Sequence, residues 1–164
     1  MKIKLALFAA CAAILVSAPA LAAQASGTCS GMTTTDFATS TSVEDTQSAT
    51  FVNLNDAGLI NFKVGKAGCV LVLLAASSEA TSGMGLIVRV MLDNTTSCSP
   101  YNDNFGFNAG INFTSSNAFV DGAMTFVCTS VPKGFHAIQV QYLAYGDAGG
   151  GVIWGERTLT VTHS

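Results

Sequence analysis

The sequence carries little charge and few basic residues, and both shortages exclude classes of protein. Only 10% of its 164 residues are charged, and 49% are hydrophobic. An ordinary soluble domain is about 25% charged. Intrinsic disorder needs the opposite balance, and a coiled coil needs abundant Glu and Lys. Seven Lys and Arg residues are too few for a phosphate-binding stripe, so we expect no nucleic-acid partner.

The sequence also lacks the motifs of nucleophilic catalysis and metal binding. It contains no G-x-S-x-G elbow and no C-x-x-C pair. Its two histidines, His136 and His163, have no ligand-like spacing. We expect His136 to be a hydrogen-bonded histidine of the core or of a strand end, and His163 to be frayed near the end of the chain.

The acidic residues give no sign of the burial that acid–base catalysis requires. Glu44 and Asp45 are adjacent in a polar stretch, and Asp147 and Glu156 flank a glycine-rich loop. We expect these side chains to be solvated. Residues 93–104 are rich in oxygen-bearing side chains, but their spacing is not that of an EF-hand. We therefore predict no enzyme activity, no cofactor and no metal, with calcium in this loop as the alternative.

A long apolar run occurs near the start of the chain. Lys2 and Lys4 precede the uninterrupted apolar run Leu5–Val16. Farther along, the small residues Ala20 and Ala22 occupy the −3 and −1 positions of a possible cleavage site after Ala22. The run is too short to span a bilayer as a helix, which needs about 20 residues. Residues 1–22 therefore read as a secretory signal peptide, cleaved after Ala22 or, as the alternative, one residue later.

Cleavage would leave residues 23–164 with five basic and ten acidic side chains, a formal charge of −5. No later apolar run is long enough for a membrane helix, so we expect a secreted, periplasmic or cell-surface protein without a membrane span. An even number of cysteines in an exported chain favours two disulfides over a metal site. The cysteines that remain are Cys29, Cys69, Cys98 and Cys128.

Alternating apolar and polar residues predict an all-β fold. Residues 23–47 are rich in Ser and Thr and form an extended N-terminal segment, and residues 48–164 form an eight-stranded antiparallel β-sandwich. Asp121-Gly122 interrupts one of these strands as either a hairpin turn or a bulge. The expected strands are residues 49–54, 59–65, 68–77, 84–93, 104–113, 118–128, 134–145 and 152–163.

The last third of the chain reads VPKGFHAIQVQYLAYGDAGGGVIWGERTLTV. It predicts two long strands joined by a glycine-rich loop, opened by G-x-H-x-I-x-V-Q and closed by R-T-L-T-V. This hairpin resembles that of small jelly-roll domains in bacterial secreted proteins and phage surface proteins. Those domains are similar in shape to the tumour necrosis factor-like and complement globular-head folds. The resemblance implies a jelly roll that is frequently a trimer.

The jelly-roll interpretation also implies a disulfide pairing. In a jelly roll the third and sixth expected strands, residues 68–77 and 118–128, are antiparallel neighbours. The start of one then meets the end of the other, which favours Cys69–Cys128 and leaves Cys29–Cys98. Four cysteines allow three connectivities, so this pairing is a preference.

Trp154 is the only tryptophan, and its orientation bears on function. Strict alternation places it on the polar face with Glu156, whereas a bulge at Gly155 would turn it into the core. If it were exposed together with Tyr101 and Tyr145, the three rings would form a surface for stacking on sugars or on another subunit.

The thinly charged surface favours a non-enzymatic structural or surface protein that associates with itself as a homo-oligomer. The alternative is a carbohydrate- or ligand-binding module that recognises a glycan or cell surface. An enzyme on a jelly-roll scaffold ranks last, because a fold alone implies no chemistry. The apolar side chains expected on outer faces are Ile87, Met91, Phe135, Leu143 and Tyr145.

Overall fold

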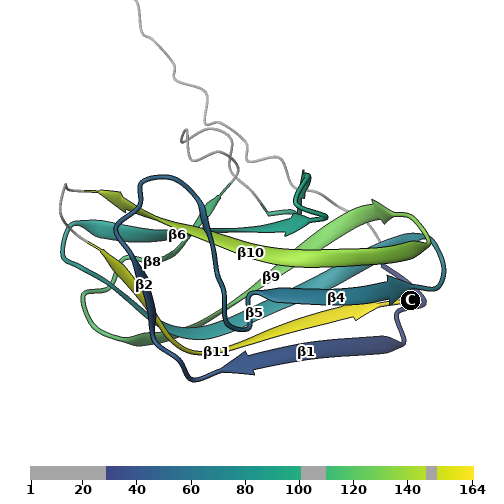
Figure 1. Ribbon diagram of the computed structural model, residues 1–164, viewed down its shortest axis with the longest axis horizontal. Helices are drawn as coiled ribbons and strands as arrows, with labels where there is room; N and C mark the ends of the chain where they lie inside the picture. The colour runs from purple at the N-terminus through teal and green to yellow at the C-terminus, as the bar shows by residue number, and fades with distance from the viewer. Residues whose placement is uncertain (1–28, 101–109, 147–150) are drawn as a thin grey trace, which may run out of the picture.

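Two antiparallel β-sheets pack face to face, as the alternating sequence predicts (Figure 1). The structure is a computed structural model that describes residues 29–100, 110–146 and 151–164. Sheet A contains β1 (Thr34–Ser40), β2 (Glu44–Thr46), β5 (Gly68–Ala80), β9 (Val120–Val131) and β11 (Val152–His163). Sheet B contains β3 (Val52–Asn53), β4 (Leu59–Val64), β6 (Met84–Leu92), β7 (Thr96–Ser97), β8 (Ile111–Thr114) and β10 (Gly134–Gly146).

The chain passes repeatedly between the sheets, which gives the jelly-roll path. In sheet A the order is β1-β11-β5-β9, and in sheet B β10 lies between β4 and β6. Each long strand therefore contacts partners that are distant in sequence. The all-β, jelly-roll-like sandwich is confirmed. The predicted signal peptide, residues 1–22, lies outside the described residues.

The sandwich begins earlier than predicted. The N-terminal segment supplies β1 and β2, which both pair with β11, and β1 runs beside it at the edge of sheet A (Figure 1). The expected lower bound at residue 48 is therefore too late. The boundary was placed too late because the inward positions of β1 hold Asp36, Ala38 and Ser40 rather than large apolar residues, which makes the alternation hard to see.

The core lies between the inner faces of the two sheets. Val72 and Leu74 of β5 meet Val88 and Val140 of sheet B in one buried apolar cluster. Burying one such side chain contributes roughly 1.5–3 kcal/mol. Because these residues recur at every second position, a one-residue slip of any strand would turn its apolar side outward.

Trp154 belongs to this core and not to the surface. The pairing of β11 with β5 shifts register between Trp154 and Arg157, so the bulge at Gly155, the alternative to strict alternation, is present. The indole is fully buried, 4.9 Å from the Phe113 ring and edge-on to Tyr142 at 5.9 Å between ring centroids. The alternative of an exposed Trp154 is therefore wrong.

The outer face of sheet B is covered by the chain itself. Ile87, Met91 and Leu143 were expected to be exposed, and that prediction is wrong because all three are buried. A Cβ at Gly110 would lie 2.5 Å from Ile87 Cγ2 and 2.6 Å from the Phe51 ring, so the segments carrying Gly110 and Phe51 lie directly on this face. Of the five predicted outer residues, Phe135 and Tyr145 are exposed.

Asp121-Gly122 forms neither a turn nor a bulge. β9 continues through both residues, with Asp121 paired to Ser77 and Gly122 to Ala76. The Phe113 ring packs against Gly122, where a Cβ would lie 3.2 Å from Phe113 Cε1. The glycine therefore makes room for an aromatic ring inside a regular strand.

All four cysteines form disulfides, but the preferred pairing is wrong. The bridges are Cys29–Cys69 and Cys98–Cys128. The third and sixth expected strands, now β5 and β9, are antiparallel neighbours as predicted. Residue pairing nevertheless places Val70, not Cys69, opposite Cys128, and both Val70 and Cys128 point into the core. Cys69 therefore points to the outer side of sheet A, where it meets Cys29.

Peptide mapping of the non-reduced protein should find the 29–69 and 98–128 crosslinks. Replacing both Cys98 and Cys128 with Ala opens a link between residues 30 apart in sequence, which should lower the free energy of unfolding by about 3–4 kcal/mol in urea titration. A Cys69–Cys128 crosslink in the mapping would contradict the structure.

Candidate functional site

A buried arginine organises one end of the sandwich. Leu159 and Val161 of β11 point into the core, and Arg157 shares their face, so its guanidinium is buried. Its Nε donates to the Asp56 carbonyl at 2.7 Å, and Nη1 donates to the carbonyls of Ser42 at 2.7 Å and Gly155 at 3.1 Å. A buried charge needs such partners, because desolvation costs several kcal/mol for each ion.

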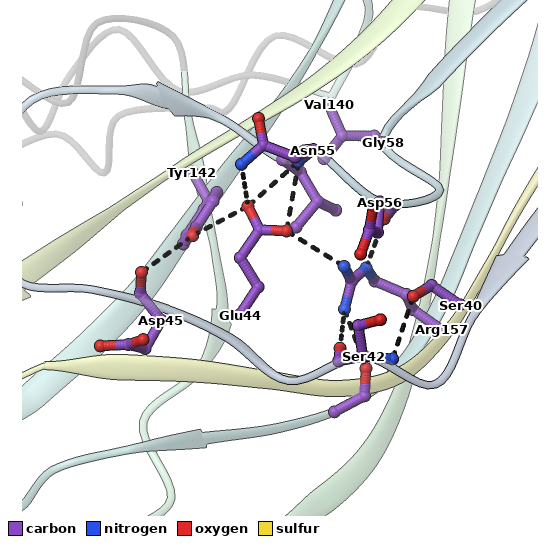
Figure 2. A network of polar contacts seen from close by, with 12 residues as sticks. Ser40, Ser42, Glu44, Asp45, Asn55, Asp56, Gly58, Val140, Tyr142 and Arg157 are labelled. Atoms are coloured by element: carbon purple, nitrogen blue, oxygen red, sulfur yellow. Dashed lines mark hydrogen bonds and ion pairs between the residues drawn. The ribbon is translucent and has the colours of Figure 1, made fainter.

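Glu44 supplies the countercharge from β2. Its Oε2 lies 3.1 Å from Arg157 Nη2 (Figure 2), and the Glu44 side chain is only 14% exposed. Oε1 accepts hydrogen bonds from the backbone and side-chain nitrogens of Asn55, each at 3.0 Å, and from the Tyr142 hydroxyl at 3.3 Å. Both members of the ion pair are thus held by further hydrogen bonds.

These contacts join the two sheets. Arg157 and Glu44 come from sheet A, Tyr142 comes from β10 of sheet B, and Asn55 lies in the turn before β4 (Figure 2). Burial raises the pKa of Tyr142, and the charge and hydrogen bond of Glu44 raise this pKa further, so the hydroxyl stays protonated as a donor. We call Arg157, Glu44, Tyr142 and Asn55 the inter-sheet tie.

The prediction that Glu44 is solvated is wrong, and the sequence held a clue to its partner. The alternation Leu159-x-Val161 points inward, and it places Arg157 on the same side. An inward arginine requires an acidic partner. The sequence does not show which carboxylate pairs with Arg157, because Glu44 is 113 residues away along the chain. Asp45 and Glu156 are exposed, as expected.

Two histidine–aspartate pairs occupy the space around Phe62. His136 Nδ1 lies 2.8 Å from Asp93 Oδ2 and its Nε2 lies 2.9 Å from the Pro132 carbonyl, so the expected hydrogen-bonded histidine is confirmed. His163 Nε2 lies 2.8 Å from Asp36 Oδ2 and the side chain is buried. The prediction that His163 is frayed is wrong, because β1 pairs with β11 as far as this residue.

None of the remaining candidate groups forms a reactive or metal site in the part of the chain that is described. The Asp93 carboxylate, from the loop considered for calcium, bonds to His136 and to the backbone nitrogen of Ala137. No group of three or more His, Cys, Asp or Glu side chains with metal-binding proximity occurs there. Trp154 is buried and Tyr145 is exposed, whereas Tyr101 lies outside the described residues.

The outer side of sheet A is the broad surface that the described chain leaves uncovered. Cross-strand pairing aligns four strands, β1, β11, β5 and β9, in three rows. We call the twelve outward residues of these rows the sheet A outer face; none is charged and none is fully buried. They are Thr35, Thr162, Leu71 and Val127; Phe37, Thr160, Leu73 and Thr125; and Thr39, Thr158, Ala75 and Ala123.

An open groove of about 350 Å³ lies at the bulged end of this face. The bulge turns Glu156 outward, and Asp121 and Ser77 also line the groove. The hydroxyl-bearing residues Thr39, Ser40, Thr41 and Thr158 also line it. The groove offers hydrogen-bonding groups without a nucleophile–base pair.

Comparisons with known proteins identify a fold but no family. No protein-family model matches the sequence, and no curated protein matches it significantly. The infectious bursal disease virus VP2 subviral particle is similar, with a TM-score of 0.51 and 12% identity over 82% of this chain and 34% of that one. The shared feature is the β-sandwich. The infectious bursal disease virus Gx strain structure gives 0.48 and 14% identity over 90% of this chain and 36% of that one.

This chain therefore spans about a third of the length of those viral chains. At such low identity the VP2 match supports the jelly-roll-like sandwich alone. The resemblance to tumour necrosis factor-like and complement domains stays a prediction. Among the described residues, no helix has the length and apolar character needed to cross a membrane.

Replacing Glu44 with Gln should destabilise the protein by about 3 kcal/mol in urea unfolding, because Arg157 would stay buried without its countercharge. Glu156→Gln is the matched control: its carboxylate is exposed on the same strand as Arg157, so the expected change is within about 0.5 kcal/mol. Equal effects of the two substitutions would contradict the inter-sheet tie.

The lowered pKa of Asp93 predicts that the stability of the fold depends on pH in the acid range. Partial burial raises its pKa, but the hydrogen bonds from His136 and Ala137 and the charge of His136 outweigh burial and lower it. Because the pKa is lower in the folded state, the carboxylate stabilises the fold above its ordinary pKa of about 3.9, and this contribution disappears as pH falls below that value.

The difference in Tm between wild type and Asp93→Asn should therefore shrink as the pH is lowered from about 6 to below about 4. A Tm difference that stays constant over this range would show that the Asp93 carboxylate does not stabilise the fold through its charge.

Proposed function

We propose that the protein is an exported, non-enzymatic structural or surface protein that associates with itself. The observation that carries this proposal is that the buried ionisable side chains already pair with one another or with an aspartate. Arg157 and Glu44 hold each other, and His136 and His163 each hold an aspartate. In the described chain these groups serve the fold and none of them is aimed at a substrate.

Export is supported by the signal-like residues 1–22 and by the two disulfides. Disulfides persist mainly in oxidising compartments, such as the periplasm, the cell surface and the medium. The Cys98–Cys128 bridge is buried, which is typical of a structural disulfide rather than a redox-active one.

Self-association is supported by the uncharged sheet A outer face. Exposed surfaces of a few hundred Å² with apolar side chains commonly mark interaction sites. The fold is compatible with assembly, since the infectious bursal disease virus VP2 structure that shares it is a subviral particle. We therefore favour a homo-oligomer over an isolated module.

The test is to express the full chain in a host that has a periplasm, sequence the N-terminus of the purified protein and measure its sedimentation. We expect a chain that begins at Ala23 and a sedimentation coefficient that rises between about 10 µM and about 1 mM. A cytoplasmic product with free thiols would contradict export. A single monomeric species over the whole concentration range would contradict self-association.

Carbohydrate binding is the second candidate, and the polar groove at the bulge is the observation that favours it. Asp121 and Glu156 supply hydrogen-bond acceptors there. The exposed Phe119 ring lies beside it, within 3.3 Å of where a Cβ on Gly155 would stand. Glycan-array binding that is lost in an Asp121→Asn, Glu156→Gln double variant would favour this function over assembly.

A further inference from the structure

We propose that two copies of this chain pair through the sheet A outer face, with the face of one copy lying on the same face of the other. This inference rests on the proposed self-association and names its surface. It replaces the surface expected from sequence, since three of the five residues predicted there are covered by the chain itself.

The composition of the face is complementary to itself. Six of its twelve residues are threonines and six are apolar, arranged so that Thr160 stands between Phe37 and Leu73 in the central row. A threonine hydroxyl both donates and accepts hydrogen bonds, so it can pair with another threonine without a specialised partner. Thr35 and Thr162 already make such a contact within one copy, at 3.3 Å between their hydroxyl oxygens.

The absence of charged residues favours this face as the contact between two identical, negatively charged chains. The whole chain has a formal charge of −3, which becomes −5 without the signal lysines, so two copies repel each other on average. The twelve residues of the face carry no charge and bring no like charges together. Asp121 and Glu156 lie at one end, beyond the three rows, where they can remain in water.

The middle of sheet A is exposed on its outer side, whereas the middle of sheet B is covered. On the outer side of sheet B, the Phe51 ring and Gly110 lie against Ile87, and Arg89 stacks on Phe51 at 4.0 Å. On sheet A, Leu73 is 40% exposed in the central strand β5, and Phe37 is 72% exposed on β1. A leucine in the middle of a central strand is left in water unless another molecule covers it.

The size of the face sets the expected strength. Four strands about 4.8 Å apart and three rows about 6.8 Å apart cover roughly 400 Å². A standard stable interface takes about 800 Å² from each partner. We therefore expect a weak dimer, with a Kd between about 1 µM and about 1 mM. Many such contacts made at once by copies on a surface would give a higher overall avidity.

Because each copy contributes the same face, the pair has two-fold symmetry. The expected species is a dimer, and a trimer would contradict this arrangement. Leu73 lies near the centre of the face, so it lies close to the two-fold axis. A lysine at this position would bring two positive charges together across that axis.

The decisive experiment compares the full exported chain with Leu73→Lys and Leu59→Lys by sedimentation velocity between about 10 µM and about 1 mM. Leu59 is the matched control, a leucine 48% exposed on β4 of sheet B. We expect Leu73→Lys to weaken pairing at least about tenfold and Leu59→Lys to leave it unchanged. Circular dichroism checks that each variant keeps its β-sheet signal.

Phe37→Lys provides a second test if Leu73→Lys fails to fold, since Phe37 lies on the edge strand and is mostly exposed. Loss of pairing in Phe37→Lys but not in a folded Leu73→Lys would indicate edge-to-edge pairing of β1 and overturn the face. Unchanged pairing in both variants would overturn the surface and leave self-association intact. A monomeric wild type would overturn the proposed self-association itself.

Discussion

The buried charge of Arg157 is the constraint that fixes how residues 40–46 and 55–58 lie against β11. A guanidinium placed between two β-sheets must be neutralised and hydrogen-bonded, because its desolvation would otherwise cost more than the apolar contacts nearby return. The chain meets this need with one carboxylate and several backbone carbonyls. Residues 40–46 and the turn at residues 55–58 are therefore held against β11 at the end of the sandwich that carries β2 (Figure 2).

The outward-facing surface follows from the same local geometry. The bulge between Trp154 and Arg157 lets both side chains point inward although two residues separate them. The residues that follow alternate regularly, so Thr158, Thr160 and Thr162 face outward beside β1 and β5. The strand β11 thus supplies both Arg157 of the inter-sheet tie and three outward threonines of the sheet A outer face. The same strand therefore takes part in stabilising the fold and in forming the surface that we propose for pairing.

Sequence reasoning succeeded where one face of a strand is apolar and failed where polar residues point inward. The strands around Val88, Val140 and Leu159 were found because the period of two places their apolar residues on the core side. β1 was missed because Asp36 points inward to His163. The disulfide pairing failed because residues 69–74 do not alternate, so the sequence could not tell that Cys69 points away from Cys128.

Surface properties were the hardest to predict. Ile87 and Leu143 lie on the outer side of their strands as expected, yet connecting segments bury them, and strand alternation carries no information about what covers a face. The candidate site was missed for a related reason. Glu44 and Arg157 meet only because the jelly-roll path brings β2 beside β11, and neither residue belongs to a recognisable motif.

Native-state hydrogen exchange of wild type and Glu44→Gln tests most directly whether the buried arginine holds this end of the sandwich together. We predict that the substitution lowers amide protection throughout the fold by the loss of global stability and lowers it further in residues 42–46 and 55–58, so that the amides of β5 and β9 keep higher protection. Unchanged protection in those two segments, or an equal loss throughout both sheets, would contradict the claim that the charge of Arg157 organises the fold locally.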